Sequence, residues 1–105
     1  MEHFVWMNLL LDFYGALLTP RQLLSCRLYF EENLSLGEIA AELNVTRQGV
    51  HDTVRRAQMQ LELYESKLLL VARFLEQQQE LKRLRALLES RRLDEMVPLL
   101  ERLIL

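Results

Sequence analysis

The apolar residues in the first thirty positions recur at the spacing of α-helices. Residues 2–18 place one apolar face at Met7, Leu10, Leu11, Tyr14, Leu17 and Leu18. Thr19-Pro20-Arg21-Gln22 then has the form of a helix start, with Thr19 as N-cap, Pro20 at the first position and Gln22 closing a capping box. This second helix is expected to run to about Phe30 and to stop at the polar residues 31–33.

A helix-turn-helix is predicted next. Ser35 and Glu38 form a second capping box, and the helix they begin places Ile39, Ala40 and Leu43 on its inner face. Asn44 tolerates a left-handed backbone and is expected to turn the chain, with Val45 plugging the turn. Thr46 is the third N-cap, and Val50 and Val54 return the next helix to the core. Two short helices crossing near a right angle need such a pattern.

After residue 60 a heptad-like seam of large apolar residues continues the chain. It fails at Gln77–Gln79 and is too short for a long coiled coil, so two helices folding back or packing across a dimer explain it better. The expected dimer interface consists of Leu61, Tyr64, Leu68, Val71, Leu75, Leu81, Leu84 and Leu88. Pro98 is expected to begin or kink a last segment.

The predicted architecture is therefore all-α. A helix-turn-helix domain without a wing spans residues 1–60, and a long helical extension, expected to dimerise, spans 61–105. The composition agrees, because half of the 105 residues are apolar and only three are Gly and two are Pro. No run approaches the length of a membrane span, and Met1-Glu2-His3 is not a basic export leader, so a soluble cytoplasmic protein is expected.

Charge is distributed unevenly along the chain. The net charge is −2, and residues 1–45 hold six acidic side chains against Arg21 and Arg27. Residues 46–57 carry +2, from three arginines against Asp52, and residues 58–105 are neutral. Phosphate neutralisation supplies most non-specific affinity for nucleic acid, so a binder of this kind should be modest in affinity and sensitive to salt.

The helix predicted over residues 46–57 is the candidate reading helix. Its expected nucleic-acid-binding residues are Thr46, Arg47, Gln48, His51, Arg55 and Arg56. The N-terminal turns of such a helix reach base edges, where Arg pairs with guanine and Gln with adenine. Arg55 and Arg56 lie further along and suit phosphates, while Thr46 offers a hydroxyl and free backbone N–H groups.

Plainer interpretations stand beside this one. The same residues could form an ordinary solvated helix face, and Asp52, which repels phosphate, could pair with Arg56 at i+4 or accept from a cytosine amine. His51 has no second ligand that would make a metal site, and Cys26 is expected to be a small buried hydrophobic residue. No set of residues for catalysis, metal or cofactor binding is present, so an enzyme is not predicted.

Several segments resemble known families. Residues 17–64, with LLTPRQ, YFEENLSLGEIAAELNV and TRQGVHDTVRRA, are similar to the region 4 helix-turn-helix of bacterial sigma factors. DFYGALLT at 12–19, LSLGEIA at 34–40, TRQGVHD at 46–52 and YESKL at 64–68 look closer still to the YlxM family of small helix-turn-helix proteins. The resemblance spans about residues 9–75 and leaves residues 76–105 unmatched.

The YlxM resemblance implies a role rather than a mechanism. In that family the gene lies beside those of the signal recognition particle GTPase or its receptor, which implies a regulatory or accessory role in protein targeting with DNA or RNA as ligand. Two hypotheses follow. One is a dimeric nucleic-acid-binding module, and the other is an adaptor that binds the targeting GTPase or its receptor without reading nucleic acid.

Overall fold

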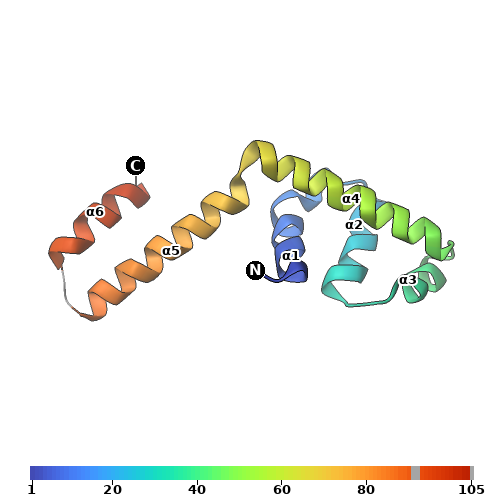
Figure 1. Cartoon of the computed structure of the whole chain (residues 1–105), viewed down its shortest axis with the longest axis horizontal. Coiled ribbons are helices and arrows are strands. Elements are labelled where there is room, and N and C mark those ends of the chain that lie inside the picture. Colours follow the sequence, from blue (N-terminus) through green and yellow to red (C-terminus); the bar gives the residue numbers. More distant parts are fainter. Residues whose placement is uncertain (91–92, 105) are drawn as a thin grey trace. The chain divides into compact units, whose positions relative to one another are not determined.

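The computed structural model describes residues 1–90 and 93–104. The elements follow the order α1 (His3–Tyr14), the 3-10 turn η1 (Gly15–Leu17), α2 (Pro20–Cys26), the π-helical turn η2 (Arg27–Glu31), α3 (Leu36–Leu43), α4 (Arg47–Leu68), α5 (Leu70–Glu89) and α6 (Leu93–Ile104) (Figure 1). The predicted all-α class is confirmed, and no strand occurs in the described part of the chain. None of its helices is both long and apolar enough to cross a membrane.

The chain divides into two compact units, Met1–Leu69 and Leu70–Leu105. The boundary expected near residue 60 falls inside α4, which continues for 22 residues and ends only where Leu69 adopts a left-handed backbone (φ 56°). Nothing in the sequence interrupts the helix earlier, because Gly and Pro are absent between Gly49 and Pro98. The extension therefore begins about nine residues later than the apolar pattern suggested.

The first unit packs α1, α2 and α3 against α4. Its fully or nearly fully buried apolar side chains are Met7, Leu10, Leu11, Tyr14, Leu18, Cys26, Phe30, Ile39, Ala40, Val50, Val54, Ala57 and Leu61. Leu17, predicted on the buried face, is 55% exposed, because α1 ends at Tyr14 and the tighter turn η1 rotates the next residues away from the helical register. Burial raises the pKa of the Cys26 thiol to about 11, as suits the buried hydrophobic residue that was predicted.

The predicted helix starts are confirmed. In the first capping box the Gln22 N–H donates to Thr19 Oγ1 (3.2 Å) and the Thr19 N–H donates to Gln22 Oε1 (3.1 Å). Ser35 and Glu38 make the same reciprocal pair at 3.1 and 3.0 Å. These bonds satisfy N–H groups that a helix start leaves without an intrahelical partner.

The end of the second helix contains a feature that the sequence did not reveal. The helix widens into η2, where the Glu32 N–H bonds to the Arg27 carbonyl at 3.0 Å, and Asn33 then takes a left-handed backbone (φ 61°). The Asn8 side chain on α1 donates to the Phe30 carbonyl at 3.1 Å. This contact ties the widened turn to α1 and fixes where the chain leaves towards α3.

In the second unit α5 and α6 form an antiparallel hairpin (Figure 1). Arg102 near the end of α6 lies 3.7 Å from Glu80 near the middle of α5, and Leu99 is buried. Pro98 does not begin the last helix, because α6 starts five residues earlier, at Leu93, and continues past Pro98 to Ile104.

Candidate nucleic-acid interface

The two helices of the predicted helix-turn-helix are α3 and the N-terminal part of α4. Ile39 and Ala40 on α3 and Val50, Val54 and Ala57 on α4 are buried where these helices pack on the rest of the unit. Because side chains three or four residues apart share a helix face, this burial leaves the opposite face of α4 to solvent. The core of the unit therefore determines which residues α4 presents.

The turn between the helices depends on Asn44. Asn44 has the left-handed backbone predicted for it (φ 56°, ψ 48°), and the Val45 N–H donates to the Ala40 carbonyl at 3.0 Å. The expectation that Val45 plugs the turn is wrong, since its side chain is 40% exposed. The left-handed residue turns the chain outward just before Thr46 becomes extended as an N-cap. Val45 instead forms part of the wall of a cavity of about 200 Å³, together with Arg21, Ser25, Leu43, Gly49, Val50 and Thr53.

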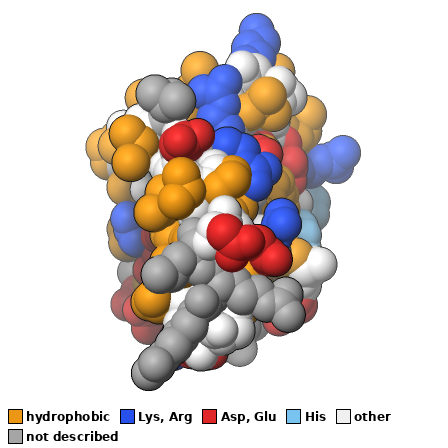
Figure 2. Space-filling view, turned by 90° about the vertical axis from the view of Figure 1, so that its left-hand side faces the viewer, with side chains coloured by type: hydrophobic (Ala, Val, Ile, Leu, Met, Phe, Trp, Pro, Cys, Tyr) orange, Lys and Arg blue, Asp and Glu red, His pale blue; other side chains and the backbone are white. Residues whose placement is uncertain are grey.

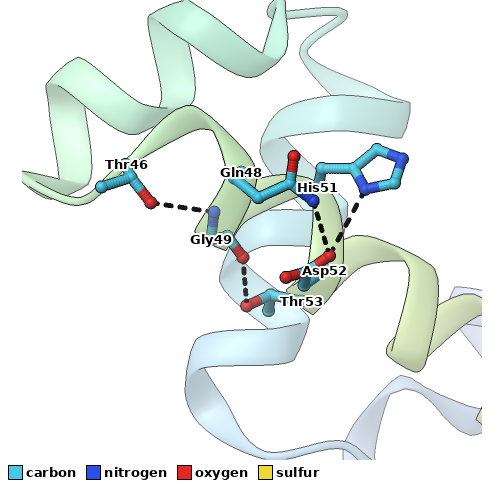
Figure 3. A network of polar contacts seen from close by, with 6 residues as sticks. All are labelled: Thr46, Gln48, Gly49, His51, Asp52 and Thr53. Carbon is cyan, nitrogen blue, oxygen red and sulfur yellow. Dashed lines mark hydrogen bonds and ion pairs between the residues drawn. The ribbon is translucent and has the colours of Figure 1, made fainter.

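A polar network organises the first turns of α4 (Figure 3). The Gly49 N–H donates to Thr46 Oγ1 at 3.0 Å, so the predicted N-cap is confirmed. The Thr53 hydroxyl donates to the Gly49 carbonyl at 2.9 Å. An ideal Cβ on Gly49 would lie only 3.0 Å from Thr46 Oγ1. The absence of a side chain at Gly49 therefore leaves room for the capping hydroxyl of Thr46.

Asp52 lies at the centre of the exposed part of this network. Its Oδ1 accepts a 3.0 Å hydrogen bond from Gln48 Nε2 and lies 3.5 Å from His51 Nδ1 (Figure 3). The predicted ion pair of Asp52 with Arg56 does not form. Helical side chains lean towards the N-terminus, and the Asp52 carboxylate accordingly reaches back one turn to Gln48.

All six predicted contact residues are exposed and lie in the first ten positions of α4 or at its cap. Within the described residues, Arg47, Arg55 and Arg56 have no carboxylate within 4.0 Å. Arg27 and Arg85, by contrast, pair with Glu31 and Glu89 on their own helical turns. The first ten residues of α4 thus carry three exposed arginines, and among the described residues none of them pairs with a carboxylate.

Contacts that the sequence did not reveal attach α1 to the C-terminal part of α4. The Tyr14 hydroxyl donates to Glu65 Oε1 at 2.6 Å in the interior, and Trp6 Nε1 donates to Glu62 Oε1 at 3.1 Å on the surface. Glu65 is 6% exposed although it is acidic. The sequence position could have indicated this burial, because Glu65 follows the buried Leu61 by four residues and therefore lies on the same side of the helix.

A second exposed surface on α4 follows the arginines. Met59 and Leu63 are 64% and 53% exposed, and with Arg55, Gln58 and Glu62 they line an open groove of about 540 Å³. We call these five residues the Met59 groove.

The eight residues predicted to form a dimer interface differ in exposure, and they are divided between the two units. Leu61 and Val71 are completely buried, Tyr64, Leu75 and Leu84 are half-buried, and Leu68, Leu81 and Leu88 are exposed. The Tyr64 ring lies 5.9 Å from that of Tyr14, within the first unit. Leu61 and Tyr64 thus pack inside the first unit, because the apolar side of α4 that carries them faces α1.

Comparison with known proteins decides the family. Residues 1–97 match the family model UPF0122, described as "Putative helix-turn-helix protein, YlxM / p13 like". The chain belongs to this UPF0122 family. It is similar to the UPF0122 protein of Bacillus pumilus, with 43% identity over 104 residues, which cover 98% of this chain and 94% of the relative.

Two further relatives agree. The UPF0122 protein of Desulforamulus reducens is 53% identical over 81 residues, covering 77% of this chain and 69% of the relative. That of an Exiguobacterium species is 48% identical over 83 residues, covering 79% and 78%. The description of the family as helix-turn-helix indicates a nucleic-acid-binding regulator.

Proposed function

We propose that this UPF0122 protein binds nucleic acid through the N-terminal half of α4. The observation that carries the proposal is the N-terminal half of α4, where Arg47, Arg55 and Arg56 are exposed and unpaired with any carboxylate of the described residues. The first 45 residues of the same unit carry a charge of −4. A phosphate backbone supplies the negative charge that these arginines lack. The helix-turn-helix character of the family supports the same function.

The residues have distinct roles in this proposal. Arg47 and Gln48 lie in the first turn and contact base edges, while Arg55 and Arg56 contact phosphates. Thr46 presents the helix N-terminus to a phosphate. His51 lies beside Gln48 on the same face, and Asp52 restrains Gln48 until a base replaces that hydrogen bond.

The finer parts of the proposal concern context. The protein acts in the cytoplasm as a homodimer, and each copy presents a helix-turn-helix similar to that of sigma region 4. Its regulatory or accessory role lies in the signal recognition particle pathway, and the ligand is DNA or the RNA of that particle. The support for this context is the resemblance of the four sequence segments to the YlxM family.

Binding of labelled genomic DNA fragments and of the targeting particle's RNA, measured over a series of salt concentrations, tests the proposal. We expect Arg47→Ala and Gln48→Ala to reduce discrimination between sequences. Arg56→Ala should weaken all sequences alike and reduce the salt slope by about 1. Arg27→Ala is the matched control, because Arg27 is an exposed arginine of the same unit already paired with Glu31 at 2.6 Å.

Two results would overturn the proposal. One is that the wild-type protein binds neither nucleic acid even at low salt. The other is that Arg47→Ala/Arg55→Ala binds as tightly as Arg27→Ala does.

The Met59 groove favours a second candidate, an adaptor that binds the targeting GTPase or its receptor. Met59 and Leu63 are large apolar side chains exposed side by side at i and i+4, and such surfaces often mark protein contacts. Under this alternative, Met59→Gln/Leu63→Gln abolishes capture of the GTPase while Arg47→Ala/Arg55→Ala retains it. Loss of capture on nuclease treatment would instead indicate a nucleic-acid bridge.

A further inference from the structure

The hairpin of α5 and α6 carries two rows of exposed apolar side chains. On α6, Met96, Leu99 and Leu103 are buried or half-buried, and the next residues along the chain are Val97, Leu100 and Ile104, which are 54%, 40% and 80% exposed. On α5, Glu80, Leu84 and Leu87 are half-buried. The residues that follow them are Leu81, Arg85 and Leu88, and the two leucines are 44% and 57% exposed. Each exposed row thus stands one position after the row through which the helices pack.

These two rows belong to one surface. An antiparallel pair of helices has an approximate two-fold axis perpendicular to the plane of the pair, which exchanges the helices and keeps each face in place. Residues one position after the packing row therefore lie on the same side of both helices. We call the combined set Leu81, Leu88, Val97, Leu100 and Ile104 the hairpin face. In the view towards the end of this hairpin, hydrophobic side chains lie at the surface among basic and acidic ones (Figure 2).

The two helices of the hairpin carry net charges of opposite sign. Residues 81–89 of α5 carry Lys82, Arg83 and Arg85 against Glu89, a balance of +2. Residues 94–104 of α6 carry Asp94, Glu95 and Glu101 against Arg102, a balance of −2. A surface that is positive along one helix and negative along the other is complementary to itself when it is turned by 180°.

We propose that the hairpin face binds the hairpin face of a second copy of this chain, giving a four-helix bundle in which α5 of each copy lies on α6 of the other. This inference rests on the homodimer in the proposed function and deepens it by naming the surface. The arrangement covers the exposed leucines and places unlike charges together, whereas α5 on α5 would place like charges together.

The contact between Glu80 and Arg102 sets the register of the pairing. These residues stand at the same height along the hairpin, since their side chains meet at 3.7 Å. A two-fold axis parallel to the helices leaves each residue at the same position along that axis. Because α5 and α6 are antiparallel, Lys82, two residues after Glu80, then lies opposite Leu100 and Glu101 of the other copy. Lys82 and Glu101 are the pair at the edge of the interface.

Sedimentation of the purified full-length chain over micromolar concentrations, without nucleic acid, tests the inference. We expect Leu88→Gln/Leu100→Gln to raise the dimer dissociation constant at least about tenfold, because two large apolar contacts are lost in each copy. Met59→Gln/Leu63→Gln is the matched control, since it exchanges two exposed apolar residues on α4 and should leave the constant unchanged. All exchanged side chains are exposed, and unchanged helicity by circular dichroism shows that each variant is folded.

A charge exchange tests the register separately. Lys82→Glu should weaken the dimer about fivefold, and Lys82→Glu combined with Glu101→Lys should restore it to within about threefold of the wild type. Failure of the second change to rescue the first would overturn this register.

The outcomes distinguish this inference from the function on which it rests. A wild-type chain that sediments as a monomer would overturn both the homodimer and the hairpin interface, leaving nucleic-acid binding by α4 to its own test. A wild-type dimer that survives Leu88→Gln/Leu100→Gln would overturn only the hairpin interface. Dissociation by Leu68→Gln or by the Met59 control alone would move the interface to α4 and would likewise overturn the inference.

Discussion

The Tyr14 hydroxyl donates a 2.6 Å hydrogen bond to Oε1 of Glu65, and both side chains are almost completely buried. The bond joins the end of α1 to the C-terminal part of α4, 51 residues further along the chain. It completes a row of polar contacts that includes Trp6 with Glu62. Since α4 also carries the candidate contact face at its other end, this row fixes the helix that presents the arginines.

Removing the Tyr14 hydroxyl should therefore destabilise the first unit. We expect Tyr14→Phe to lower the free energy of unfolding by about 1–3 kcal/mol, because a buried carboxyl group loses a donor while the aromatic packing is kept. Urea denaturation measures the change. Tyr64→Phe is the control, since Tyr64 is half-buried and its hydroxyl only accepts a local bond from Gln60. Equal losses of unfolding free energy in the two variants would show that the Tyr14–Glu65 hydrogen bond contributes no more to stability than the Gln60–Tyr64 bond does.

Gly49 and Thr46 should be energetically coupled. Thr46→Ala removes the N-cap of α4 and should cost about 1 kcal/mol. Gly49→Ala would add about 1 kcal/mol of helix propensity, but its Cβ would press on Thr46 Oγ1 at 3.0 Å and disturb the cap. We therefore expect Gly49→Ala to be neutral or destabilising in the wild type and stabilising in the Thr46→Ala background.

A double-mutant cycle followed by thermal or urea unfolding measures this coupling. Additive effects of the two substitutions would contradict it. Gly37→Ala serves as the control, because a Cβ on Gly37 meets nothing closer than 3.9 Å.

Local signals in the sequence predicted the helix starts and the turn of the helix-turn-helix. The caps at Thr19, Ser35 and Thr46 and the left-handed Asn44 all depend on residues within four positions of each other. Such bonds form between neighbours in the chain, so a short motif contains all the information needed.

Features that depend on distant segments could not be predicted in this way. The widened turn η2 and the buried Glu65 both contact α1, which lies far from them in the chain. The apolar seam after Leu61 could not reveal its partner, because a leucine packs as well on its own chain as on another. Spacing predicted that five residues of α4 face away from the core, and all five are exposed: Arg47, Gln48, His51, Asp52 and Arg55. The choice of Gln48 over Arg56 as the partner of Asp52 needed side-chain directions.

Glu38 should make the stability of α3 depend on pH. Hydrogen bonds from the Ser35 backbone and side chain lower the pKa of the Glu38 carboxyl below its ordinary value of 4.5. A carboxyl whose pKa is lower in the folded chain stabilises it above the unfolded pKa, and this contribution is lost as the pH falls through the folded pKa. The wild type should thus lose more stability than Glu38→Gln between about pH 6 and about pH 3, because glutamine keeps the capping box without titrating.

Urea unfolding of the two proteins at several pH values measures this difference. Glu42→Gln, on the same helix and outside the box, is the control. Parallel pH profiles for the wild type and Glu38→Gln would contradict the assignment.

Asp52 should weaken nucleic-acid binding and restrain its specificity. It places a negative charge among the exposed arginines of α4 and holds Gln48 by a 3.0 Å hydrogen bond. We expect Asp52→Asn to raise the affinity for every sequence by about two- to tenfold at low salt, with the gain fading as salt screens the charge. Fluorescence anisotropy over a salt series measures this effect. Asp12→Asn on α1 is the control, because it makes the same change in net charge away from the exposed side of α4.

Equal gains in affinity in both variants would mean that the total charge of the protein, rather than the charge on α4, governs binding. A loss of affinity in Asp52→Asn would show instead that the carboxylate accepts a hydrogen bond from the ligand, as a cytosine amine would donate.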